Sequence, residues 1–231
     1  MCCNFGTSDM TDTPAIDETM LRQAVLDAAL AMSQRGLSPG RSGNVSARFR
    51  DGMLITPSGM AYDAIVPADI VFVAGDGTQP PGQRKASSEW RFHLSAYGAR
   101  ADQAAIVHTH SMHATVLACA HKPIPAFHYM VAAAGGADIP CVPYATFGTA
   151  ELSKHVADGV RNRDACLMAN HGMIAMGASP ARALELAADV EVLAEQYIKV
   201  LLLGGANVLP AAEMQIVIER FKSYGQKAQG S

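Results

Sequence analysis

The sequence contains few aromatic and few charged residues, and neither sign of charge is in clear excess. Aromatic residues make up 6% of the 231 positions and charged residues 17%, with a formal net charge of −3. Recognition of nucleic acid needs a basic surface or a set of stacking aromatic side chains, so we expect no nucleic-acid partner. The hydrophobic fraction of 49% excludes a disordered chain. It is also somewhat high for a soluble monomer, which indicates buried subunit interfaces.

Long hydrophobic runs are missing as well, and the cysteines form no recognisable framework. The nearest candidate for a membrane span, around 200–203, stops at two glycines. The number of cysteines is odd and their spacing is wide, which fits neither a disulfide framework nor a zinc ribbon. They are Cys2, Cys3, Cys119, Cys141 and Cys166. We therefore expect a reduced, soluble, cytoplasmic protein with no membrane partner.

The apolar pattern predicts an α/β fold with a largely antiparallel sheet. Apolar residues at helical spacing up to Met32, followed by Gly36, predict a helix over 18–35. Two short apolar runs joined through Asp51-Gly52 predict a hairpin. Further strands are expected at 70–74, 105–110, 139–144, 165–169 and 173–176. Further helices are expected from 87, over 111–121 and 150–162, from 180 to about 203, and over 211–224.

Two histidines separated by one residue are the sharpest chemical signal. His108 and His110 lie on a predicted strand, where residues two apart point to the same face, so both imidazoles can bind one metal. They can equally be two polar residues on an open face. His171, at a strand end next to a glycine, is a candidate third ligand or part of an ordinary turn. Three histidines with open coordination positions are typical of a catalytic metal site.

Glu89 is the second signal, because it is a carboxylate in an otherwise apolar and aromatic run. We expect it one turn inside a helix that starts near Ser87-Ser88. It can act as the partner in a capping box or as a general base near the metal, and the sequence does not distinguish these roles. The remaining histidines are interpreted as satisfied or solvated side chains, with His113 nearest to the proposed metal. They are His93, His113, His121, His128 and His155.

Small polar residues and glycines at turns form a third signal. They are Gly43-Asn44, Ser58-Gly59 and Ser87-Ser88. Helix starts and turns of this kind gather backbone N–H groups that bind phosphate without a Walker lysine, although turn chemistry alone explains any one pair. No GxxxxGK[ST] motif is present, and no GxGxxG follows a strand, so a nucleotide cofactor is not indicated.

Five segments, in this order, resemble the class II aldolase and adducin family. They are SGNVSARFRDGMLITPSGM, SSEWRFHLSAY, AIVHTHSMHAT, HYMVAAAGGADIPCVPYATFGT and NHGMIAMG. The resemblance covers 18–225 and leaves 1–17 and 226–231 as tails. It implies a single-domain α/β/α sandwich around a largely antiparallel central sheet. It also implies a homotetramer with fourfold cyclic symmetry and active sites at the subunit interfaces.

The resemblance also implies a role for each site residue. Zn²⁺, with Co²⁺ or Mn²⁺ as alternatives, would be bound by His108, His110 and His171, and Glu89 would be both a resting ligand and the acid/base. The substrate phosphate would be bound by Asn44, Ser58, Gly59, Ser87 and Ser88. Tyr129 would reach a neighbouring subunit's site and protonate the aldehyde oxygen. The aldehyde end would be shaped by Phe147, Phe221 and Tyr224. Arg41 departs from the family pattern, which has a short hydroxyl residue there.

The activity implied is zinc-dependent cleavage of a 1-phosphoketose to dihydroxyacetone phosphate and an aldehyde. The substrate would be L-fuculose 1-phosphate or a related 5-deoxy- or 5-methylthioribulose 1-phosphate. A pentulose-phosphate 4-epimerase and a methylthioribulose-1-phosphate dehydratase are alternatives within the family. A non-catalytic, adducin-like interaction domain is an alternative of another class, which the three histidines and Glu89 disfavour. A Schiff-base aldolase needs a desolvated lysine, and none of the six lysines lies in an apolar strand.

Overall fold

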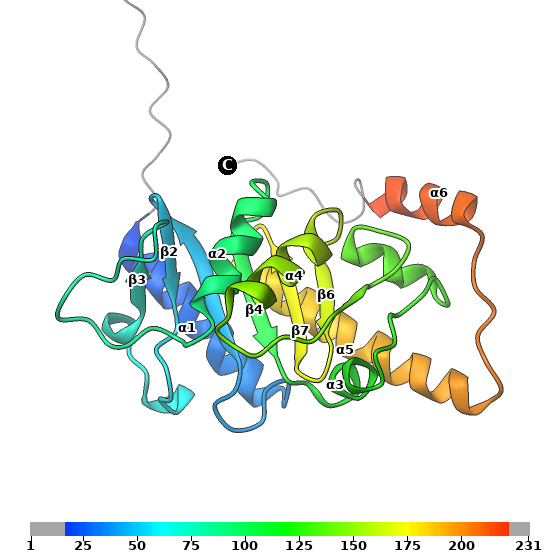
Figure 1. Ribbon diagram of the computed structural model, residues 1–231, viewed down its shortest axis with the longest axis horizontal. Helices are drawn as coiled ribbons and strands as arrows, with labels where there is room; N and C mark the ends of the chain where they lie inside the picture. Colours follow the sequence, from blue (N-terminus) through cyan, green and yellow to red (C-terminus); the bar gives the residue numbers. More distant parts are fainter. Residues whose placement is uncertain (1–16, 222–231) are drawn as a thin grey trace, which may run out of the picture.

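The computed structural model describes residues 17–221, and its centre is one seven-stranded sheet (Figure 1). The strands lie in the order β3 (Val71–Val73), β2 (Gly52–Ile55), β1 (Asn44–Phe49), β4 (Ala105–Thr109), β7 (Gly172–Gly177), β6 (Ala165–Met168) and β5 (Cys141–Val142). Neighbouring strands are antiparallel except for β5 and β6, which are parallel. The predicted, largely antiparallel sheet is confirmed.

Helices cover both faces of this sheet. One apolar core lies between the sheet and α1 (Glu18–Gln34), α3 (Met112–Cys119), α5 (Pro180–Leu202) and α6 (Ala211–Phe221). The other lies under α2 (Trp90–Ala99) and α4 (Ala150–Val160). Strand β4 contributes to both cores, because Val107 faces the first and Ile106 the second. The α/β/α sandwich is therefore confirmed. No helix in the described part of the chain has the length and apolar character needed to cross a membrane.

In the described part of the chain, short 3-10 helices connect some of the larger elements. They are η1 (Tyr62–Ala64), η2 (Pro67–Asp69) and η3 (Tyr129–Ala134).

The structure corrects the predicted bounds of one strand and one helix. The strand expected over 139–144 is reduced to Cys141–Val142, because the flanking Pro140 and Pro143 have no N–H to donate to a sheet. Helix α2 begins at Trp90, so Glu89 stands at the N-cap position rather than one turn inside.

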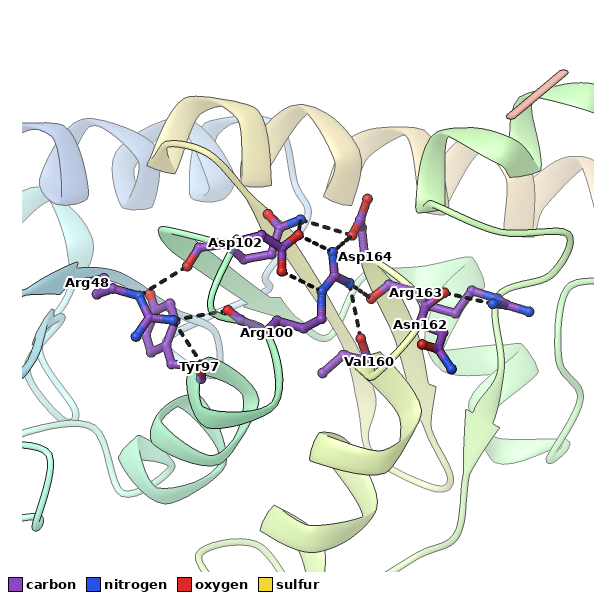
Figure 2. A network of polar contacts seen from close by, with 9 residues as sticks. Arg48, Tyr97, Arg100, Asp102, Val160, Asn162, Arg163 and Asp164 are labelled. Carbon is purple, nitrogen blue, oxygen red and sulfur yellow. Dashed lines mark hydrogen bonds and ion pairs between the residues drawn. The ribbon is translucent and has the colours of Figure 1, made fainter. Parts of the chain in front are cut away.

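An arginine network joins the elements at one end of the central strands (Figure 2). The guanidinium of Arg100, just after α2, donates hydrogen bonds to the carbonyls of Val160 (3.1 Å) and Arg163 (2.6 Å). It also forms an ion pair with Asp164 (2.7 Å). Arg48 on β1 donates to the carbonyl of Arg100 at 3.0 Å. The network ties the C-terminal end of α2 to α4 and β1, and thereby helps to fix the position of the opposite helix end, which carries Glu89.

Candidate active site

Three imidazole rings meet at the other end of the central strands. His108 is on β4, His110 follows the last residue of β4, and His171 lies in the turn between β6 and β7. The ring centroids lie 4.8 to 4.9 Å apart, and one nitrogen of each ring lies within 4.8 Å of the other two. The structure thus brings together the three histidines that the sequence singles out.

The hydrogen bonding of His108 defines which of its nitrogens faces the other rings. Its Nδ1 lies 2.8 Å from the carbonyl oxygen of Met173, and since a carbonyl only accepts, Nδ1 carries the proton. In the neutral ring, Nε2 therefore has a free lone pair, and it lies 3.0 Å from Nε2 of His110. Burial, together with the neighbouring His108 and His171, lowers the pKa of His110 to about 3. Burial would lower the pKa of His108, but the Glu89 carboxylate raises it. Three ring nitrogens this close together are suited to a metal ion, which binds imidazole in its neutral form.

Glu89 completes this cluster from the start of α2. Its Oε2 lies 3.2 Å from Nε2 of His108, and its Oε1 lies 3.0 Å from Nε2 of His171. Burial alone would raise the pKa of Glu89, but the interactions with His108 and His171 hold it well below its usual range. Its side chain makes no capping hydrogen bond, so the capping-box interpretation is wrong. One carboxylate and three imidazoles form a donor set that fits a divalent metal ion.

A cavity of about 330 Å³ opens beside Glu89, His110 and His171. Its wall includes all five residues predicted to bind phosphate, namely Asn44, Ser58, Gly59, Ser87 and Ser88. The predicted aldehyde-end residue Phe147 also lines it. Tyr144 and Asn170 line it too, and the sequence reasoning missed both. Asn170 has a positive φ of 55°, and an Asn-His-Gly turn is a sequence signal that could have indicated its conformation.

The serine and glycine turns of this wall are held together by backbone contacts. The N–H of Ser58 donates to the carbonyl of Lys85 at 2.8 Å, and the N–H of Ser87 donates to that of Thr56 at 3.1 Å. The turn after β2 and the segment before α2 therefore form one unit, with Gly59 at a φ of +72° that favours glycine. The residues of both segments that are predicted to bind phosphate line the same cavity as Glu89, His110 and His171.

The first glycine turn, which contains Gly43 and leads into β1, is fixed to β4, the strand that carries His108. Asn44 pairs with His108 across β1 and β4, and the hydroxyl of Tyr62 donates to the carbonyl of Gly43 at 2.6 Å. A Cβ on Gly43 would lie 2.7 Å from the carbonyl oxygen of His108 and 2.5 Å from Oγ of Ser38. Only glycine fits at this position, so the turn and the strand are in direct backbone contact.

Arg41 stands at the rim of the cavity. Its guanidinium donates a hydrogen bond to the carbonyl of Gly59 at 2.9 Å, so it bridges the first glycine turn and the Ser58-Gly59 turn. Among the described residues that line the cavity, Arg41 is the only lysine or arginine. The residue that departs from the family pattern therefore contributes a permanent positive charge next to the predicted phosphate residues.

Two predicted residues, Tyr129 and Phe221, do not line this cavity. Tyr129 begins η3 and is 51% exposed, and it is absent from the cavity lining. Phe221 ends α6 and packs, partly buried, against the core near η3. Tyr224 lies outside the described residues. Within this chain, Tyr129 and Phe221 therefore lie apart from the cavity that the histidine cluster and the serine and glycine turns share.

A sequence model for the family described as the class II aldolase and adducin N-terminal domain matches residues 23–198. The chain belongs to the class II aldolase and adducin family. A 5-methylthioribulose-1-phosphate/5-deoxyribulose-1-phosphate aldolase of Rhodospirillum rubrum is 52% identical over 209 residues, covering 90% of this chain and 94% of that protein. The L-fuculose phosphate aldolase of Escherichia coli K12 is 47% identical over 211 residues, covering 91% and 98%.

A solved structure titled L-fuculose 1-phosphate aldolase agrees with this family member over most of both chains. The TM-score is 0.85 at 38% sequence identity, covering 88% of this chain and 96% of the other. Family membership, the aldolase names and the fold match agree with one another. The family that the five sequence segments resemble is confirmed, and so is the expectation of an aldolase-type lyase.

Proposed function

We propose that this member of the class II aldolase and adducin family cleaves a 1-phosphoketose to dihydroxyacetone phosphate and an aldehyde, with Zn²⁺ as its metal. The observation that carries the proposal is the convergence of three imidazoles and the Glu89 carboxylate on the wall of a cavity built from serine and glycine turns. Close relatives are named as aldolases of L-fuculose phosphate and of 5-methylthio- and 5-deoxyribulose 1-phosphate. The absence of a membrane-spanning helix among the described residues is compatible with action in the cytoplasm.

His108, His110 and His171 would hold the metal, with Glu89 beside them. Nitrogen-rich sets of this kind suit Zn²⁺, and Co²⁺ or Mn²⁺ are the alternatives. Bound there, Zn²⁺ would supply Lewis-acid stabilisation of the negative charge that aldol cleavage leaves on the substrate. The carbonyl of Met173 keeps His108 in the tautomer that directs Nε2 at the metal position. Metal analysis of the purified protein tests the identity of the ion.

The substrate phosphate would lie on the serine and glycine turns. Hydroxyl groups of Ser58, Ser87 and Ser88 and the N-terminal end of α2 are neutral or partly positive donors for an anion. Arg41 would add a full positive charge at the cavity rim, on a guanidinium whose planar group can bind two phosphate oxygens at once. Asn44 and Gly59 would complete the binding turns. The distance between phosphate and reacting carbons would then be set by the same helix start that carries Glu89.

Glu89 would act as the acid/base. Its carboxylate is ionised beside the histidines, so it can take the hydroxyl proton whose loss starts the cleavage of the carbon–carbon bond. It can then deliver a proton to the carbon that has lost its bond partner, which gives dihydroxyacetone phosphate. Proton transfers of this kind typically contribute about 10²–10⁴-fold to the rate.

The binding site for the aldehyde half of the substrate would be completed by a second subunit of a homotetramer with fourfold cyclic symmetry. Tyr129 is exposed and lies outside the cavity of its own subunit, so it can serve only the site of a neighbour, where it would protonate the aldehyde oxygen. Phe147 would line the aldehyde end from its own subunit. Phe221, on the helix beside η3, and Tyr224 would accompany Tyr129.

Cleavage rates on three substrates test the proposed activity. L-fuculose 1-phosphate, 5-deoxyribulose 1-phosphate and 5-methylthioribulose 1-phosphate are compared under one set of conditions, with the release of free dihydroxyacetone phosphate as the readout. We expect cleavage of at least one. Formation of an epimer or a dehydrated product, without free dihydroxyacetone phosphate, would instead identify one of the alternative family activities.

Subunit mixing tests the tetramer and Tyr129 together. Light scattering should give the mass of a tetramer. Glu89→Gln and Tyr129→Phe subunits are each expected to be nearly inactive alone, and a reassembled mixture should regain activity, because some interfaces then combine both native side chains. A fully active monomer, or a mixture that stays inactive, contradicts the shared site.

A further inference from the structure

A continuous chain of buried hydrogen bonds extends from Glu89 into the space between β1 and α2. Its members, in order, are Glu89, Asn44, His93, Ser46 and Tyr97. The four links measure 2.8, 2.5, 2.7 and 2.9 Å. No member is more than 6% exposed, and His93 and Ser46 are fully buried. Because water does not compete for these groups, the orientation of each one depends on its neighbours.

Two sequence periodicities bring these residues together. Glu89, His93 and Tyr97 are four positions apart, so they follow one face of α2 and the residue before it. Asn44 and Ser46 are two positions apart on β1, so both side chains point to the same side of the sheet. The helix lies along the strand with these two rows facing each other, and each strand residue is placed between two residues of the helix row.

The direction of every hydrogen bond in the chain follows from the placement of the Asn44 amide. Its NH₂ group donates to Oε2 of Glu89, and its carbonyl oxygen faces Nε2 of His93. The Nε2 of His93 must then carry a proton to donate to that oxygen. Burial lowers the pKa of His93 to about 3, so the ring is neutral and its Nδ1 accepts from the hydroxyl of Ser46.

The same logic orients the last link. The hydroxyl of Ser46 has given its proton to His93, so its oxygen accepts from the hydroxyl of Tyr97. Burial raises the pKa of Tyr97, so this hydroxyl keeps its proton. The four hydrogen bonds therefore all point the same way, with Tyr97 as the first donor and Glu89 as the last acceptor. A flipped Asn44 amide would place its oxygen against the carboxylate and its NH₂ against the N–H of His93.

We propose that His93 is a positioning residue that locks the Asn44 amide, and through it the Glu89 carboxylate, in the orientation used for catalysis. The functional part of this inference rests on the proposed role of Glu89. The chain does not conduct protons, because the Asn44 amide neither takes up nor releases one in the pH range of the protein. Its role is to keep one donor permanently aimed at Oε2 of Glu89, which holds the carboxylate in place. The second N–H of Asn44 remains for the substrate.

The tautomer of His93 tests the arrangement in the wild-type protein. Nitrogen NMR of ¹⁵N-histidine-labelled protein, metal-free and zinc-loaded, distinguishes a protonated Nε2 from a protonated Nδ1 and from the cation, with the signal assigned by its loss in His93→Gln. We expect a neutral ring with the proton on Nε2 at pH 7, in both samples. A cationic ring or a proton on Nδ1 overturns the proposal, and this measurement needs no variant to fold or to be active.

Ser46→Ala tests the direction of the chain, with a matched control. The variant removes the hydroxyl that donates to Nδ1 of His93, so the Nδ1 signal should shift, while Nε2 still faces the Asn44 oxygen and should keep its proton. Ser153→Ala removes another buried hydroxyl, on α4, which donates to the carbonyl of Thr149 at 3.0 Å, and should leave the His93 signals unchanged. Unchanged His93 signals in Ser46→Ala contradict the proposed direction.

Kinetics of two His93 variants test the function. His93→Leu removes the donor to Asn44, and loss of an outer-shell partner typically costs about 10–100-fold in activity. We expect this loss in kcat, with little change in KM, and a substantial recovery in His93→Gln, whose amide can donate to Asn44. Thermal unfolding of both variants is measured in parallel. A folded His93→Leu with wild-type kcat overturns the proposal.

The outcomes separate this inference from the proposed function. If wild-type protein cleaves none of the three phosphoketoses while His93 shows the expected tautomer, the proposed function fails and the arrangement of the chain stands. If wild-type protein cleaves a phosphoketose while His93→Leu keeps its kcat, the positioning role fails and the proposed function stands.

Discussion

Glu191 on α5 caps the N-terminal end of α3 through its carboxylate. Its Oε1 accepts the backbone N–H of His113 at 2.8 Å, and its Oε2 accepts the N–H of Ala114 at 2.9 Å. The Nδ1 of the His113 ring lies 2.8 Å from the same Oε1. Ser111, the N-cap residue, makes no capping hydrogen bond itself. A side chain from a distant helix therefore fixes the turn that directly follows His110.

Glu191→Ala should destabilise the protein and weaken its metal binding. Loss of a capping side chain typically costs about 1 kcal/mol, and hydrogen bonds to charged groups contribute about 1.5–3 kcal/mol. We expect a lower Tm and a larger zinc dissociation constant, since the turn after His110 is no longer fixed. Glu195→Ala, one turn later on α5, removes an exposed pair with Lys199 and serves as the control. Equal effects of the two substitutions would argue against a special role for Glu191.

Removal of the metal should abolish cleavage. Chelation leaves His108, His110 and His171 without an ion, and negative charge on the substrate is then not stabilised. We expect activity to disappear on dialysis against a chelator and to return with added Zn²⁺ or Co²⁺. Full activity of protein shown by elemental analysis to contain no metal would rule out a metal-dependent mechanism.

Glu89→Gln should remove proton transfer while it keeps the shape of the side chain. Because general acid–base steps are worth about 10²–10⁴-fold, kcat should fall by that factor, with zinc content near that of the wild type. Exchange of the α-proton of dihydroxyacetone phosphate with solvent should slow in parallel. Normal cleavage by this variant would place the acid/base elsewhere, with Tyr129 or His113 as the next residues to replace.

Ser88→Ala should raise KM for phosphorylated substrates. Ser88 is exposed in the cavity at the start of α2, where a phosphate oxygen would lose a hydroxyl donor. One lost hydrogen bond to a charged group is worth about 1.5–3 kcal/mol, which corresponds to about a tenfold to hundredfold change. An unphosphorylated analogue should be affected much less. Equal losses on both compounds would mean that Ser88 has no role in phosphate binding.

The pH dependence of stability should carry the signature of neutral, buried His93. Its pKa is lowered to about 3 in the folded state, against about 6.5 in an unfolded chain. The unfolded chain therefore binds a proton between these values that the folded chain does not, and stability falls as pH decreases from about 6.5 towards 3. The slope is about 1.4 kcal/mol per pH unit for one proton. Unfolding measured from pH 7.5 to 5 should show this extra slope relative to His93→Gln. Parallel curves would mean that His93 titrates normally.

The fold and the cluster of three histidines can be predicted from the sequence, because both depend on local periodicity. The two-residue spacing of His108 and His110, and the glycine after His171, are local features that survive folding unchanged. The start of α2 was predicted less well. Ser87-Ser88-Glu89 resembles a helix start with its acidic partner, but contacts with His108 and His171 hold the carboxylate away from the helix N–H groups.

The role of His93 could have been suspected from the sequence but not established by it. Its spacing from Glu89 and Tyr97 is visible, and so is that of Asn44 and Ser46. What the sequence does not contain is the packing of α2 along β1, which turns two unrelated rows of polar residues into one buried chain. Tyr129 is a different case, because its ring stacks on that of His128 at 4.9 Å and is half exposed outside the cavity, so its proposed role needs a second chain.

The close contact of Gly43 with the carbonyl of His108 constrains how this enzyme can evolve. Any side chain at Gly43 would collide with the strand that carries His108, so the inner part of the turn cannot be altered without displacing one of the three clustered histidines. Arg41, two residues earlier and exposed at the rim, has no such constraint. Substrate preference can therefore diverge at the mouth of the cavity while the machinery for cleavage is inherited unchanged. A lineage could in this way acquire a new ketose phosphate by substitutions at the rim alone.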